Sequence, residues 1–145
     1  MTDQRLWHGG APGLKTGDLL LPPSVTGVVT TAQWMAARGF DPHTHGVEAD
    51  RMRLDRVYLT HDKDLARANA GCWTVLAQGG FHIDRPERYG SLYVARPVGE
   101  SGPDPDLPDD SIECERAEIV AVYDPAVILP ARKIDRVMLS KVGAR

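Results

Sequence analysis

The stretch Arg5-Leu6-Trp7-His8-Gly9-Gly10, followed by Gly17-Asp18-Leu19-Leu20-Leu21, decides how this chain is interpreted. A short apolar run ends on a histidine and two glycines, which predicts a strand that delivers His8 to a turn. Because glycine has no Cβ, Gly9 and Gly10 allow a ligand to approach the backbone closely. His8 is therefore a candidate wall of a ligand-binding cleft, and the alternative is a histidine whose hydrogen bonds are satisfied within the turn.

Length and composition predict one globular domain that spans residues 1–145. The net charge of -3 argues against a nucleic-acid partner, because such binding requires Lys and Arg to neutralise phosphates. Cys72 and Cys114 form no Cys-x-x-Cys motif, so neither a zinc site nor a redox motif is expected. We find no signal-peptide pattern and no apolar run of transmembrane length, so we expect a cytoplasmic protein that does not bind membranes.

Strand and helix signals follow one another irregularly. Residues 54–60, 90–97 and 117–123 are predicted strands, the second closed by Pro97 and the third apolar enough to be central. Residues 30–38 and 62–78 are predicted helices, and Gly71 within the second indicates close packing there. Residues 98–115 are expected to form an acidic loop, and an amphipathic segment near residues 134–139 is left open between strand and helix. The lack of regular alternation favours an α+β fold with mostly antiparallel pairing over a parallel βαβ sheet.

A histidine-rich loop is the one candidate metal site. His43 and His45 could chelate a metal with His61 or Asp50 as a third ligand, but the polar composition of residues 41–50 favours a solvated loop. We therefore expect no metal.

Three pieces of sequence, in order, resemble the rifampin ADP-ribosyltransferase family. They are the His-Gly-Gly turn with its Gly-Asp-Leu-Leu run; Val-Tyr-Leu-Thr at residues 57–60 with the Ala-rich helix after it; and Leu-Tyr-Val-Ala-Arg-Pro-Val-Gly at residues 92–99 with the Asp-Pro-Asp-Leu segment and the Glu-Ile-Val-Ala-Val strand. Together they span residues 6–123. The resemblance implies two small, mostly antiparallel sheets that clasp an NAD cleft, with one or two short helices.

The resemblance also implies roles for individual residues. His8 corresponds to the family histidine that binds NAD near its adenosine ribose, Tyr58 to the tyrosine that packs against nicotinamide, and Asp104 to the acidic residue. An imidazole can bond a ribose hydroxyl, a phenol offers a flat face to an aromatic ring, and a carboxylate can stabilise the positive charge that develops at the ribose. Gly9 and Thr60 are expected beside the cofactor. Asp106, Asp109 and Asp110 compete with Asp104 for the acidic role, which stays open.

The expected activity is mono-ADP-ribosyl transfer from NAD to an acceptor hydroxyl by a monomeric enzyme. The acceptor is a rifamycin-type antibiotic, another small molecule or a macromolecule; the chain lacks the family's Phe-Pro-Gly-Asn-Pro stretch, which leaves that choice open. Two alternatives remain. One is a non-catalytic module that binds a nucleotide or a protein. The other is a relative of the NAD-dependent RNA 2′-phosphotransferases, for which Arg51, Arg53 and Arg56 are the only clustered arginines.

Overall fold

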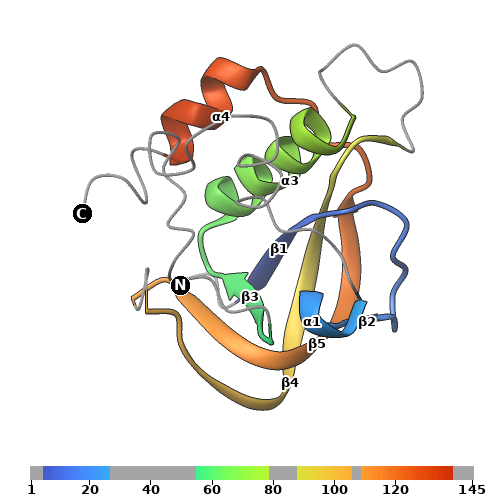
Figure 1. Ribbon diagram of the computed structural model, residues 1–145, viewed down its shortest axis with the longest axis vertical. Helices are drawn as coiled ribbons and strands as arrows, with labels where there is room; N and C mark the ends of the chain where they lie inside the picture. Colours follow the sequence, from blue (N-terminus) through green and yellow to red (C-terminus); the bar gives the residue numbers. More distant parts are fainter. Residues whose placement is uncertain (1–4, 27–54, 79–87, 106–108, 139–145) are drawn as a thin grey trace.

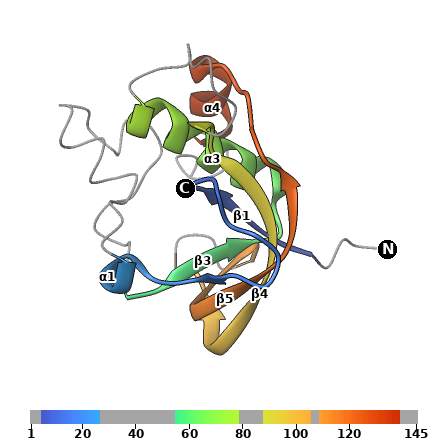
Figure 2. The same ribbon diagram turned by 90° about the vertical axis from the view of Figure 1, so that its right-hand side faces the viewer.

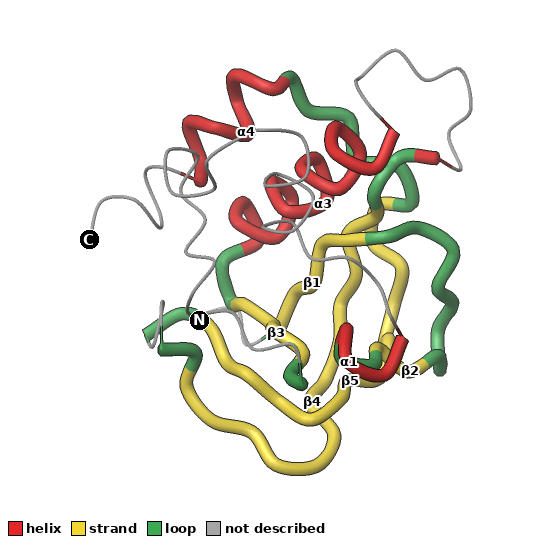
Figure 3. The backbone as a smooth tube through the Cα atoms, in the orientation of Figure 1, coloured by secondary structure: helices red, strands yellow, loops and turns green. Residues whose placement is uncertain are grey.

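The computed structural model describes residues 5–26, 55–78, 88–105 and 109–138 (Figure 1). The predicted α+β class is confirmed, and Figure 3 shows where helix and strand lie along the backbone. The predicted helix at residues 30–38 lies outside the described residues. The elements follow in the order β1 (Leu6–Gly10), β2 (Leu19–Leu20), α1 (Pro23–Thr26), β3 (Val57–Thr60), α3 (Lys63–Gln78), β4 (Ser91–Pro103), β5 (Ser111–Asp124) and α4 (Ala131–Met138).

The strands form one antiparallel sheet, not the two sheets that the resemblance implies. Its order is β2-β5-β3-β1-β4, and β5 also pairs with β4, so that β1, β3, β5 and β4 close into a ring. β4 and β5 have 13 and 14 residues, and their pairing shifts register at three places. Such irregularities bend a strand, and both strands are visibly curved in Figure 2. Because β4 and β5 pair with each other from Leu92 to Pro103, the five strands form one sheet and do not separate into two.

Two predictions for residues 90–115 are wrong. β4 does not end at Pro97, which instead pairs with Ala117 in the interior of the strand. On the edge of β4 away from β5, β1 pairs only with residues 91–95. No described strand pairs with this edge at Pro97, so the missing N–H of the proline costs no hydrogen bond between described strands. The expected acidic loop at residues 98–115 is mostly a hairpin, because β4 continues to Pro103 and β5 begins at Ser111. Only residues 104–110 connect the two strands.

The ring of strands separates two apolar clusters. The outer cluster lies between the sheet and helices α3 and α4, and the inner cluster draws on all four strands of the ring. Alternate residues of a strand face opposite sides, so β1 and β4 contribute to both clusters, whereas β3 and β5 contribute only to the inner one. The buried members of the outer cluster are Trp7, Leu65, Ala66, Ala68, Ala70, Cys72, Leu92, Val127, Leu129 and Ile134. Those of the inner cluster are Val57, Leu59, Tyr93, Ala95, Cys114, Ala117 and Ile119.

Helix α3 begins as predicted. The Asp62 carboxylate accepts a hydrogen bond from the Leu65 N–H at 3.1 Å, which satisfies one of the unpaired donors of the first turn. The close packing expected at Gly71 is confirmed, since a Cβ there would lie 2.6 Å from Cδ1 of Ile134 on α4. Up to Met138, the amphipathic segment that the sequence left open between strand and helix is the helix α4. The contact at Gly71 packs it against α3.

Candidate functional site

His8 lies in the middle of β1, because the strand continues through Gly9 and Gly10, which pair with β4; the predicted turn directly after His8 is therefore wrong. His8 contacts the strand that carries the second motif. Its Nδ1 lies 3.1 Å from the backbone carbonyl oxygen of Tyr58. Because a carbonyl oxygen only accepts, Nδ1 carries the proton, and Nε2 of the neutral ring is a hydrogen-bond acceptor. Burial lowers the pKa of His8, and the bond to Tyr58 opposes that effect only in part, so the imidazole is neutral at neutral pH.

The surroundings of His8 leave room beside Nε2. The ring of Tyr93 stacks at a centroid distance of 6.4 Å, and the Tyr93 hydroxyl donates to the Ala11 carbonyl at 2.6 Å. At Gly10, an added Cβ would come within 3.0 Å of Nε2. The absence of a side chain at Gly10 therefore keeps open the space next to the one acceptor that His8 can offer. An acceptor of this kind fits a ribose hydroxyl.

Gly9 serves the packing of the helix. A Cβ at Gly9 would lie 1.7 Å from the Ala66 carbonyl oxygen and 2.8 Å from the Ala70 nitrogen, both in the backbone of α3. Gly90, which precedes β4, meets the same helix, because its Cβ would lie 2.1 Å from the Ala70 carbonyl oxygen. The missing side chain of Gly9 thus admits a helix backbone, whereas the sequence predicted that it would admit a cofactor.

Tyr58 is half-buried on β3 between Val57 and Leu59, which both face the inner cluster. Alternation turns the Tyr58 side chain to the opposite face of the sheet. His8 stacks with Tyr93, another member of the inner cluster, so its imidazole and the Tyr58 phenol lie on opposite faces. The structure therefore brings His8 to the backbone of Tyr58 and not to its ring.

Thr60 ends β3 and is buried. Its hydroxyl donates to the Asp110 carbonyl at 3.3 Å and accepts from the Asp62 N–H at 3.0 Å. The His61 N–H donates to the same Asp110 carbonyl at 2.7 Å. These bonds attach the turn between β4 and β5 to the end of β3, so the acidic segment meets the Val-Tyr-Leu-Thr motif. The Thr60 hydroxyl holds the junction together rather than standing exposed to a cofactor.

The acidic candidates belong to that turn. Asp104 is half-buried directly after β4, and its N–H donates to the Ser111 carbonyl at 3.0 Å. Asp109 and Asp110 are exposed, whereas Asp106 lies outside the described residues. Because β5 runs between this end of β4 and β3, Asp104 is separated from Tyr58 by a strand.

Glu113 is the carboxylate that sequence reasoning missed. It is the cross-strand partner of Tyr58 in the β3–β5 register, so the two side chains leave the same face of the sheet. One of its carboxylate oxygens, Oε2, is buried. The expectation of a loop at residues 98–115 concealed it. The alternation of Glu113 with Ile112 and Cys114 is the signal that could have revealed a strand with Glu113 on its polar face.

No protein-family model matches this chain, and neither does any curated protein. Within the described ranges, no cluster of three or more His, Cys, Asp or Glu side chains could hold a metal ion. His43, His45 and Asp50, the candidate metal ligands of the sequence analysis, lie outside those ranges, as do Arg51 and Arg53. None of the helices in the part of the chain that the structure describes is both long and apolar enough to cross a membrane.

Proposed function

We propose that this protein is a mono-ADP-ribosyltransferase that uses NAD as co-substrate and modifies an acceptor hydroxyl. One observation carries the proposal: the His8 imidazole of the first motif donates to the Tyr58 carbonyl of the second. This bond holds the ring as the neutral tautomer with its acceptor nitrogen beside the space that Gly10 leaves open. The two motifs, which lie far apart in the sequence, form the neighbouring antiparallel strands β1 and β3.

In this proposal NAD supplies the ADP-ribosyl group: the bond between nicotinamide and ribose breaks and a bond from ribose to the acceptor oxygen forms. Nε2 of His8 accepts a hydrogen bond from a ribose hydroxyl. The resemblance assigns the nicotinamide ring to the flat apolar face of Tyr58, which lies on the other side of the sheet. A carboxylate stabilises the positive charge that develops at the ribose and takes up the proton of the acceptor hydroxyl.

Two carboxylates compete for that last role. The resemblance favours Asp104, whereas the register favours Glu113, which pairs directly with Tyr58. Asp104→Asn and Glu113→Gln remove each charge at nearly unchanged size. The variant that abolishes transfer and keeps NAD binding identifies the carboxylate, and Glu100→Gln, at an exposed position of β4, is the matched control.

The test is the release of nicotinamide from NAD by the purified protein, with and without rifampicin, beside a Tyr58→Ala variant. Release that requires rifampicin and is lost in the variant supports both the transferase and its acceptor. Release without rifampicin supports the reaction with another acceptor. If neither release nor NAD binding is detected, the proposal is wrong.

Gly10→Ala tests the site without disturbing the fold. The added Cβ meets only the outer end of the His8 ring within 3.4 Å, so the fold should persist while the space beside Nε2 shrinks. We expect a raised KM for NAD. Gly102→Ala is the control, because a Cβ at Gly102 meets nothing within 4 Å.

The positions of His8 and Tyr58 on opposite faces favour a second candidate, a module that binds a nucleotide without cleaving it. NAD binding without release of nicotinamide under any of these conditions would support this module instead.

A further inference from the structure

Three cationic side chains gather around two aromatic rings outside the sheet, between β1, β5 and the start of α3. The Arg5 guanidinium carbon lies 4.7 Å from the centre of the Trp7 ring, and the Lys63 ammonium lies 5.2 Å from the same centre. Lys63 also lies 4.0 Å from the centre of the Tyr123 ring, and the two rings meet edge-on at 4.9 Å. This cation–aromatic cluster consists of Arg5, Trp7, Lys63, Arg67 and Tyr123.

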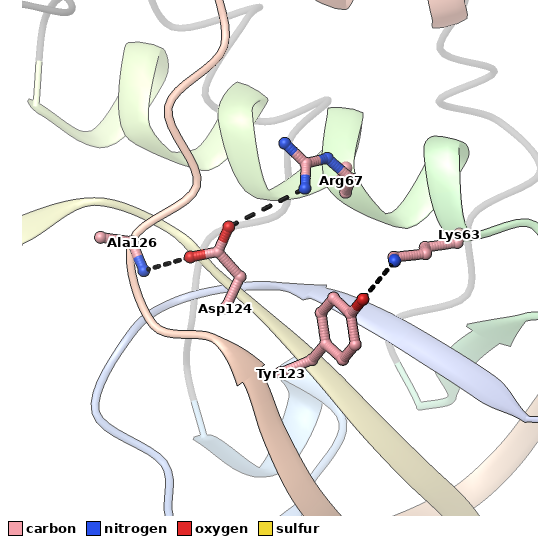
Figure 4. A network of polar contacts seen from close by, with 5 residues as sticks. All are labelled: Lys63, Arg67, Tyr123, Asp124 and Ala126. Atoms are coloured by element: carbon pink, nitrogen blue, oxygen red, sulfur yellow. Dashed lines mark hydrogen bonds and ion pairs between the residues drawn. The ribbon is translucent and has the colours of Figure 1, made fainter.

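The cluster is built on a rigid base and opens to solvent. Trp7 is fully buried, whereas Tyr123 is 48% exposed. Lys63 and Arg67 are one helical turn apart on α3 and both reach toward the end of β5 (Figure 4). The Tyr123 side of the cluster therefore offers a ring and several donors to a molecule in solution.

The cations of the cluster contact neutral groups of the cluster, and one of them also has a carboxylate partner. Lys63 donates to the Tyr123 hydroxyl at 2.7 Å, and that partner is a neutral phenol. Arg67 faces the Asp124 carboxylate at 3.9 Å, and the other oxygen of this carboxylate accepts from the Ala126 N–H at 3.0 Å. The hydrogen bond from Lys63, followed by the charges of Lys63, Arg5 and Arg67, lowers the pKa of Tyr123. The Tyr123 phenol thus lies in the field of three cations, in a chain whose net charge is -3.

We propose that this cluster binds a phosphate monoester attached to a flat ring, with the phosphate among Arg5, Lys63 and Arg67 and the ring against Tyr123. A monoester carries a charge near -2 at neutral pH, and its oxygens accept from several donors at once. Guanidinium groups form paired hydrogen bonds with phosphate as with carboxylate, and the larger negative charge of a monoester favours phosphate among several cations. The exposed face of Tyr123 provides a surface for stacking.

This cluster lies on the face of the sheet opposite the His8 imidazole, because Trp7 and His8 are successive residues of β1, and on the same face as the Tyr58 side chain. Its test uses binding and not nicotinamide release. Phenyl phosphate, inorganic phosphate and phenol serve as probes at millimolar concentration in low salt, with binding measured by calorimetry. The double variant Lys63→Gln/Arg67→Gln is compared with Arg132→Gln/Lys133→Gln, which removes two exposed charges from α4.

We expect phenyl phosphate to bind more tightly than inorganic phosphate and phenol not to bind. The Lys63/Arg67 variant should weaken phenyl phosphate at least about tenfold, whereas the α4 variant should bind as the natural protein does. Tyr123→Leu should reduce phenyl phosphate to the affinity of inorganic phosphate, and His8→Gln should leave both unchanged. If circular dichroism shows that the double variant does not fold, the single variant Arg67→Gln takes its place. Equal weakening in the two double variants, or no binding of either phosphate, would overturn the proposal.

Discussion

Replacing Gly9 by Ala should destabilise the protein strongly, because the position faces a helix backbone. The new Cβ would lie 1.7 Å from the Ala66 carbonyl oxygen. An ordinary carbon–oxygen contact is about 3.3 Å, so α3 and β1 must separate by roughly 1.6 Å. Rotation of a side chain cannot relieve this contact, since the atoms on both sides belong to the backbone.

The separation would open the outer cluster, in which α3 covers Trp7 and Leu92. A gap of even 1 Å forfeits up to about half of the dispersion energy of the facing atoms. Overpacking of a core costs about 1–3 kcal/mol, and a backbone contact this short belongs at the upper end. We therefore expect Gly9→Ala to lower the free energy of unfolding by about 3 kcal/mol, a large part of the roughly 5–15 kcal/mol typical of a domain.

Urea denaturation followed by far-ultraviolet circular dichroism measures this loss. Gly102→Ala is the matched control, since the same substitution on β4 meets nothing within 4 Å and should change stability by no more than about 0.5 kcal/mol. If Gly9→Ala were as stable as Gly102→Ala, the reasoning that Gly9 exists to admit α3 would be refuted.

Two further predictions concern ionisable groups. Because burial lowers the pKa of His8 in the folded protein below its ordinary value of 6.5, the unfolded chain takes up this proton first as the pH falls. As the pH falls, the free energy of unfolding should decrease from about pH 6.5 to the pKa of His8 in the folded protein, and below that pKa His8 should cause no further change. His8→Gln should flatten the curve of unfolding free energy against pH in that window. An unchanged slope would contradict the conclusion that His8 is buried and neutral. Burial also raises the pKa of the Cys72 thiol to about 12 and that of Cys114 to about 11, so both should resist a thiol reagent at neutral pH until denaturant is added. Rapid modification of either thiol in the folded protein would show that it is accessible.

Local signals were sufficient to predict much of the architecture. The strand before His8, the strand that contains Tyr58 and the helix after Asp62 follow from apolar spacing, a β-rich run and a capping residue, all properties of neighbouring residues. The close approach at Gly71 was likewise predictable, since a glycine within a helix has a cost that packing can explain. The apolar character of residues 117–123 predicted a strand, but within it only Ala117 and Glu118 pair with strands on both edges, β2 and β4, and Val120, Val122 and Tyr123 are exposed.

Only the tertiary structure decided which segments far apart in the chain lie side by side. Pro97 was expected to end a strand because it lacks an N–H, yet none of the described strands pairs with the edge of β4 away from β5 at this position, so no hydrogen bond between described strands is lost. The acidic run looked like a loop because its charges outweigh its alternation, and only the register with β3 shows that Glu113 faces Tyr58.

The same limit applies to the glycines and to the candidate site. Gly9 and Gly10 are identical in sequence terms, but α3 packs on the first and His8 flanks the second. The sequence by itself determined which residues could do chemistry, because residue type and local spacing carry that information. Their neighbours were decided by sheet pairing, which depends on contacts across 50 residues or more of chain, as between His8 and Tyr58.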